Sequence, residues 1–97
     1  MEITFALSGL SDLENIKDYY TEQCVPHIGQ KLVTDIVTHI QTLSDHPDIG
    51  RIVPEFSKDY IRELIHPPFR VVYLREQYGV KVIRVWRSER LLQLDDE

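Results

Sequence analysis

The sequence predicts an α+β fold in which a helical hairpin packs on a small, mainly antiparallel sheet, in the order β-α-α-β-β-β. Three observations predict this class. The chain opens on a segment that alternates polar and apolar residues, continues with two segments whose apolar residues recur at helical spacing, and then carries three runs rich in β-branched and aromatic residues. Its 97 residues suffice for one hydrophobic core, so we expect a single domain over residues 1–97.

Residues 2–7 are expected to form a half-buried strand, because polar and apolar side chains alternate along them. A first helix is then expected to begin at Ser11, since a serine followed three residues later by Glu14 is a capping-box pattern. Pro26 ends that helix, and a longer one is expected from about Pro26 to Ser44 along one continuous apolar stripe. The two apolar stripes are best buried by an antiparallel hairpin laid on a sheet.

A turn at residues 48–51 separates the helices from the three later strands, and its glycine, Gly50, is expected to have a positive φ. The strands are expected at residues 60–65, 69–75 and 80–87. Connections of only two to four residues between them indicate that neighbouring strands run antiparallel.

The composition, 42% hydrophobic and 28% charged, is that of a folded globular protein rather than a disordered chain. The single cysteine, Cys24, excludes an internal disulfide framework and fits a reducing compartment. No apolar run approaches the roughly 20 residues that a membrane-spanning helix needs, and the N-terminus has no basic-then-apolar signal pattern. We therefore expect a cytoplasmic protein without a membrane partner.

Charge is distributed unevenly along the chain, whose net charge is −5. Residues 1–60 carry four Lys or Arg against ten Asp or Glu, whereas residues 61–92 carry seven against three. The late strands are therefore expected to form a cationic surface on an otherwise acidic molecule, which suits a polyanion or an acidic protein partner. The alternative is that charge divides unevenly by chance in a small protein.

Arginines recur among the apolar residues of the last two expected strands. Alternation places Arg84 and Trp86 on one side of the last strand with Val82, and Arg87 on the other side with Val85. Guanidinium groups bind phosphates and carboxylates through two parallel hydrogen bonds. The alternative is that these arginines only solubilise the outer face of a half-exposed sheet. Trp86, the single tryptophan, is either a core or partly buried anchor or an exposed hot spot.

The sequence offers no pattern for metal, cofactor or covalent chemistry. Its four histidines lack ligand spacing and its cysteine has no partner nearby, and neither a glycine-rich phosphate loop nor a nucleophile elbow is present. We expect no metal and no cofactor. These features leave open whether the protein is an enzyme and favour a non-enzymatic role.

Several segments carry a resemblance to a known family, at residues 12–20, 46–55, 62–64, 69–73 and 82–90. Two motifs within them, a Pro-x-x-Gly-Arg turn and an aromatic-Arg-Val-Val-Tyr strand, are together fairly specific in this order and spacing. On these residues the chain resembles the ParE/RelE toxin superfamily of bacterial type II toxin–antitoxin modules, and the ParE-like members more than the RelE-like ones. The resemblance implies the same β-α-α-β-β-β fold.

The resemblance implies two rival activities. RelE-like members cut mRNA on the ribosome, usually with basic residues and a C-terminal tyrosine, whereas ParE-like members poison DNA gyrase. Here Arg70 matches the arginine of the strand motif, but no tyrosine follows Arg90. Metal-free ribonuclease chemistry also needs a general base and a general acid, and arginine stays protonated near neutral pH. The resemblance therefore favours a gyrase inhibitor. The alternative is a ribosome-dependent mRNA endonuclease with Arg70, Arg87 and Arg90 as its catalytic candidates.

Under either activity the resemblance implies a cognate antitoxin that wraps the helical hairpin and a sheet edge and folds as it binds. Operator DNA would then be contacted only through the toxin–antitoxin complex. The residues expected to bind the target or the antitoxin are Arg70, Arg84, Trp86, Arg87 and Arg90. A third alternative, favoured by the acidic net charge, is a family member that is not toxic and only binds its antitoxin.

Overall fold

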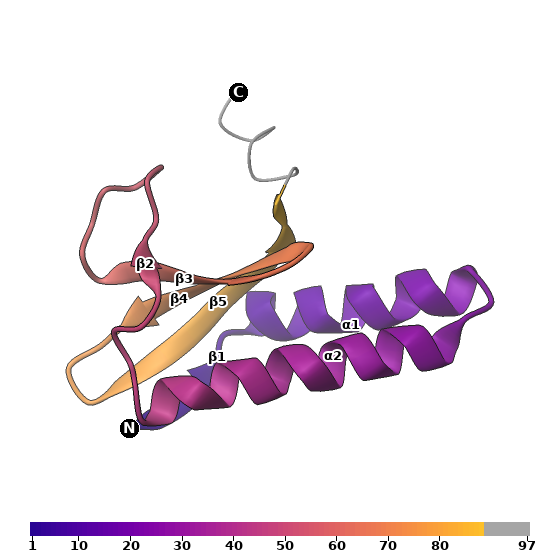
Figure 1. Cartoon of the computed structure of the whole chain (residues 1–97), viewed down its shortest axis with the longest axis horizontal. Coiled ribbons are helices and arrows are strands. Elements are labelled where there is room, and N and C mark those ends of the chain that lie inside the picture. Colours follow the sequence, from indigo (N-terminus) through magenta and orange to yellow (C-terminus); the bar gives the residue numbers. More distant parts are fainter. Residues whose placement is uncertain (89–97) are drawn as a thin grey trace.

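In the computed structural model, which describes residues 1–88, two helices pack on one face of a five-stranded mixed sheet (Figure 1). The predicted α+β class and element order are confirmed. The elements are β1 (Glu2–Phe5), α1 (Leu7–Glu22), α2 (Pro26–Gln41), a 3-10 turn (Thr42–Ser44), β2 (Arg51–Ile52), β3 (Ile61–His66), β4 (Phe69–Arg75) and β5 (Gly79–Arg87).

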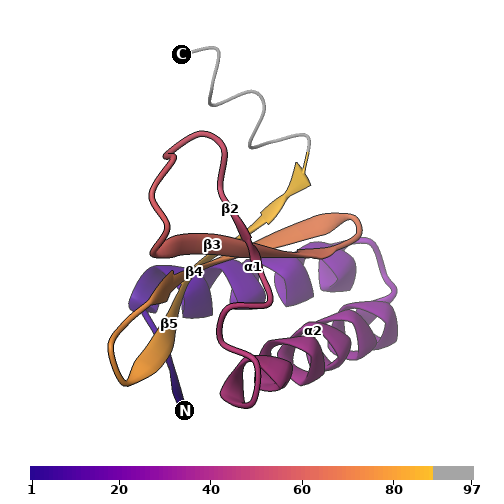
Figure 2. The ribbon, with the colours of Figure 1, turned by 60° about the vertical axis from the view of Figure 1, so that its left-hand side comes forward.

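The strands are ordered β1-β5-β4-β3-β2 across the sheet. β1 lies parallel to β5, and the other neighbours are antiparallel. The sequence did not predict β2, because two residues carry no detectable alternation. The chain from β2 to β3 rises from the sheet on the side away from the helices (Figure 2). None of the helices described is long and apolar enough to cross a membrane.

The first helix begins earlier than predicted, and its expected capping box is wrong. α1 starts at Leu7 without a side-chain cap, after Ala6 in an extended conformation, and Ser11 lies inside the helix. Contact with the sheet explains the early start: the Ala6 N–H donates to the Val82 carbonyl at 2.9 Å. Gly9 allows α1 to cross β5 closely, because a Cβ there would lie 2.8 Å from the Val82 oxygen.

The hairpin between the helices follows the prediction. Cys24 adopts a left-handed conformation with φ of 64°, and Pro26 occupies the first turn of α2, where its missing N–H costs nothing. Gly29 then lets α2 approach α1, since a Cβ there would lie 3.0 Å from the Cβ of Tyr20. The second helix ends at Gln41 and continues as the 3-10 turn to Ser44, as far as the sequence predicted.

The core lies between the helices and the sheet. Apolar side chains of both layers meet there, and the strands contribute more of them than the helices: Leu13, Ile16, Ile36, Ile40, Leu43, Leu64, Phe69, Val71, Tyr73, Val80, Val82 and Val85. A register shift between Val72 and Tyr73 interrupts the alternation of β5. Val82 and Val85 therefore both point to the core, and the prediction that Val82 shares a side with Arg84 is wrong.

Gly50 was predicted to need a positive φ, and this is wrong because no glycine described has one. The position requires glycine for space instead. A Cβ at Gly50 would lie 2.6 Å from the Tyr73 hydroxyl and 2.7 Å from the Glu63 carbonyl oxygen. The Gly50 N–H donates to that hydroxyl at 3.0 Å, and the hydroxyl donates to the Pro47 carbonyl at 2.8 Å. Burial raises the pKa of Tyr73.

Tyr73→Phe is expected to lower the free energy of unfolding by about 1–3 kcal/mol, because it leaves the buried Gly50 N–H without an acceptor. Urea unfolding of the variant checks this. Tyr78→Phe, at a side chain that is 80% exposed, is the matched control and should change stability by no more than about 0.5 kcal/mol. Equal effects of the two substitutions would contradict the role given to the Tyr73 hydroxyl.

Candidate functional site

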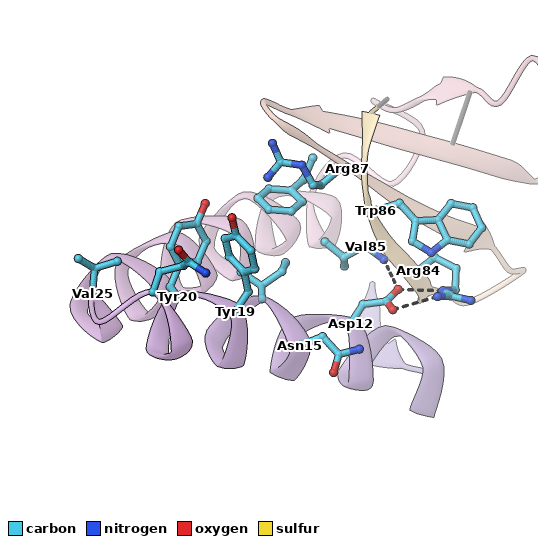
Figure 3. Close-up of a pocket in the computed structure, with 12 residues that line it drawn as sticks. Asp12, Asn15, Tyr19, Tyr20, Val25, Arg84, Val85, Trp86 and Arg87 are labelled. Carbon is cyan, nitrogen blue, oxygen red and sulfur yellow. Dashed lines mark hydrogen bonds and ion pairs between the residues drawn. The ribbon is translucent and has the colours of Figure 1, made fainter. Parts of the chain in front are cut away.

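A groove of about 790 Å³ lies between α1 and the end of β5 (Figure 3). One side is formed by α1 residues and the other by the last residues of β5, with Val25 of the hairpin and Phe69 of β4 completing it. The lining residues are Asp12, Asn15, Ile16, Tyr19, Tyr20, Gln23, Val25, Phe69, Arg84, Val85, Trp86 and Arg87. Three of the five residues predicted to bind a partner, Arg84, Trp86 and Arg87, therefore line the same groove.

The groove exists because β1 is short. β1 pairs with β5 only from Gly79 to Val82, so β5 continues past the end of its neighbour and lies beside α1. Side chains of α1 form hydrogen bonds with backbone groups along this edge of β5. Ser8 Oγ donates to the Ile83 carbonyl at 2.6 Å, and the Val85 N–H donates to Asp12 Oδ2 at 2.8 Å.

Asp12 connects α1 to the edge of β5. It is 8% exposed and also accepts from Arg84, at 2.8 Å from Nε and 3.0 Å from Nη2 (Figure 3). The Arg84 guanidinium lies over the Trp86 ring at 4.5 Å, where a cation–π contact is favourable. Trp86 is half-buried, as the partly buried alternative predicted, and lines the groove. Arg84 therefore shapes the groove wall through its bonds to Asp12.

Aromatic rings make up much of the remaining lining. Tyr19 is 53% exposed and packs edge-on against Tyr20, with the ring centroids 5.0 Å apart. Arg87, at the end of β5, lies over the ring of Phe69 at 5.6 Å. Exposed aromatic and arginine side chains around a concave surface are typical of protein-binding sites.

Arg70 lies on the opposite face of the sheet, because its neighbours in β4, Phe69 and Val71, point to the helices. It is 5% exposed. Its Nη1 and Nη2 donate to Glu55 at 3.0 and 3.1 Å, and its Nε donates to Glu63 at 2.5 Å. Burial lowers the pKa of Arg70, but the hydrogen bonds and charges of Glu55 and Glu63 outweigh burial and raise it. Arg70 thus holds the loop between β2 and β3 to the sheet.

The predicted cationic surface is largely neutralised within the molecule. Arg51 Nε lies 2.5 Å from Glu63, and Arg75 Nε lies 2.8 Å from Asp48. With the pairs of Arg62, Arg70 and Arg84, five described arginines of the sheet have carboxylate partners. Acidic residues from earlier in the chain fold back onto the late arginines, so charge segregation along the sequence does not become segregation in space. Arg90, the remaining predicted site residue, lies outside the described residues.

The sequence did not identify Asp12, Tyr19 or Glu63 as site or network residues. Asp12 lies four positions before Ile16 and so on the buried face of α1. A carboxylate on a buried helical face requires a partner, and this is the signal that could have found it. Nothing in the local sequence distinguishes Glu63 from an exposed strand residue.

His39 of α2 and His66 of β3 contact each other through their Nδ1 atoms, which lie 3.0 Å apart. Burial, and then the charge of His66, lowers the pKa of His39. Within residues 1–88 no three side chains of the kinds that ligate metals are clustered.

The stability of the protein is expected to fall as the pH decreases below about 6.5, because the pKa of His39 is lower in the folded chain than in the unfolded one. The unfolded chain then binds the additional proton. The Tm of the wild type should therefore drop more steeply from about pH 7 to about pH 5 than the Tm of His39→Gln. His27→Gln, at an exposed histidine, should keep the wild-type slope. Identical slopes for the wild type and His39→Gln would contradict this expectation.

Comparisons with known proteins bear on this architecture. A family model described as the ParE toxin of type II toxin–antitoxin systems, parDE, matches residues 3–92. Among solved structures, the chromosomal ParDE TA system from P. aeruginosa contains a chain with 24% sequence identity and a TM-score of 0.76. The superposition covers 90% of this chain and 95% of that one. At this identity the likeness establishes the fold alone. No curated protein sequence matches significantly.

Proposed function

Because this chain belongs to the ParE toxin family of type II toxin–antitoxin systems, we propose that it is a toxin and that an antitoxin neutralises it by filling the groove between α1 and β5. The observation that carries this proposal is the placement of the aromatic groove beside the length of β5 that extends past β1. The similar chain of P. aeruginosa comes from a chromosomal ParDE TA system.

The geometry of the groove supports a peptide segment as its occupant. Tyr19 and Trp86 offer apolar ring surface with few side-chain torsions to immobilise, which is the usual composition of a binding hot spot. A segment that buries apolar side chains on these rings can order as it binds. An antitoxin tail that is disordered when free and folds on binding behaves in this way.

Substitution in the groove tests the antitoxin part. Trp86→Ala and Tyr19→Ala are each expected to weaken the complex with the antitoxin encoded beside this chain by about tenfold or more. Tyr78→Ala, at an exposed tyrosine outside the groove lining, should leave the affinity within about twofold. Calorimetric titration measures all three, and wild-type affinity in both groove variants would contradict the proposal.

For the target, we propose DNA gyrase. The support is chemical: Arg70, the nuclease candidate in β4, is held by the carboxylates of Glu55 and Glu63, and its pKa is raised. A raised pKa keeps the Arg70 guanidinium protonated, so Arg70 cannot act as the general base that metal-free mRNA cleavage needs. Inhibition of a protein by surface contact does not need proton transfer.

Incubating the purified protein with gyrase and relaxed or supercoiled plasmid tests the target. The expected result is loss of supercoiling or accumulation of cleaved plasmid trapped by gyrase, both prevented by the antitoxin. Ribosome-dependent mRNA cleavage without any effect on gyrase would overturn this proposal and establish the endonuclease. If induction alone neither arrests growth nor affects either target, the protein is a family member that only binds its antitoxin.

A further inference from the structure

The outer surface of α1 carries a row of three acidic residues, the last two of which lie beside the groove. Glu14, Asp18 and Glu22 are spaced four residues apart, so they lie along one side of the helix, and all three are exposed. In the described part of the chain none of them belongs to an ion pair, unlike the carboxylates of Asp12 and Glu63. Their carboxylates therefore contact solvent, and a bound partner can pair with them.

The last two members of this row, Asp18 and Glu22, adjoin the groove lining. Asp18 follows Asn15 by three positions, and Glu22 follows Tyr19 by three positions, so each acid neighbours a lining residue on the helix surface. Inside the groove Asp12 and Arg84 neutralise each other, and Arg87 lies on the opposite wall, over the ring of Phe69. The α1 rim of the groove is thus negative, on a chain whose net charge is −5.

We propose that the segment of the antitoxin that occupies this groove is basic on the side that faces α1, with lysines or arginines opposite the acidic row and apolar side chains on Tyr19 and Trp86. The inference rests on the proposed function, in which the groove holds the antitoxin. Charge complementarity selects this occupant. An acidic segment would place like charges against the carboxylates of Asp18 and Glu22, whereas a basic segment gains attraction and a faster encounter.

The spacing of the row also predicts a pattern in the occupant. Four helical residues rise by about 6 Å. Side chains on one face of an extended segment recur at about 6.6 Å, and those at every fourth position of a helix recur at about 6 Å. Basic residues are therefore expected at every second position if the segment is extended, or at every fourth position if it is helical.

Two synthetic peptides test the proposal on the full chain. They share the same apolar residues and carry either lysine or glutamate at alternate polar positions. Trp86, the single tryptophan, lines the groove and reports binding through its fluorescence. The lysine peptide is expected to bind at least about tenfold more tightly than the glutamate peptide at low salt, and added salt should reduce the difference.

Matched double variants locate the effect. Asp18→Asn with Glu22→Gln should remove most of the preference for the lysine peptide, whereas Asp59→Asn with Glu76→Gln, which neutralises two exposed acids outside the groove lining, should retain it. Equal binding of both peptides, tighter binding of the glutamate peptide, no change in Trp86 fluorescence with either, or equal loss in both double variants would overturn the inference. If the cognate antitoxin nevertheless requires Tyr19 and Trp86, the proposed function stands and only the charge assignment fails.

Discussion

Arg70→Met is expected to lower the free energy of unfolding by about 3–5 kcal/mol, the usual effect of removing one partner from a buried ion pair. The Glu63 side chain is fully buried, and that of Glu55 is 15% exposed. Without the guanidinium, the Glu63 carboxylate keeps only the contact with Arg51, and Glu55 loses the pair that holds its loop to the sheet. Chemical denaturation followed by circular dichroism measures the difference.

The same carboxylate provides a matched control. Arg51 pairs with Glu63 from the solvent side, and its side chain is 60% exposed. Arg51→Met should therefore cost no more than about 1 kcal/mol. The double variant Glu63→Leu with Arg70→Met should recover part of the lost stability, since it removes both charges and fills the site with apolar groups. A stable Arg70→Met protein that has lost toxicity would contradict the structural role and restore Arg70 as a contact residue.

Asp12→Ala is expected to destabilise the protein by about 2–4 kcal/mol. The substitution removes the acceptor of the Val85 N–H and the partner of the Arg84 guanidinium at once. It should also release the guanidinium from the position in which it lies over Trp86, and so alter the fluorescence of that residue. Thermal unfolding and tryptophan emission of the same sample measure both effects.

Glu14→Ala is the control for Asp12→Ala, because it removes an acidic side chain from the same helix at an exposed position. Its stability should remain within about 0.5 kcal/mol of the wild type. If both variants unfold alike, Asp12 contributes no more than helix-surface charge. If Asp12→Ala is destabilised but its tryptophan emission is unchanged, the carboxylate stabilises the strand edge without positioning Arg84.

The candidate site was only partly predictable. Arg84, Trp86 and Arg87 were expected to bind a partner because arginines and the single tryptophan alternate along β5, and they do line one groove. The other half of that groove comes from α1, more than sixty residues earlier in the chain. Tyr19 resembles any exposed helical tyrosine in the sequence, so only the contact between α1 and β5 gives it a place in the site.

The sequence by itself determined the element order and class, because hydrophobic periodicity is a local property: a period near 3.6 requires a helix with one buried stripe, and a period of 2 requires a strand. Tertiary structure alone decided where α1 begins, why residue 50 is glycine, and which arginines are bound internally. Each of these depends on atoms distant in the chain, such as the Val82 carbonyl or the Tyr73 hydroxyl. A charge in the sequence has no partner until the chain folds, and here folding places most of the sheet's arginines against carboxylates.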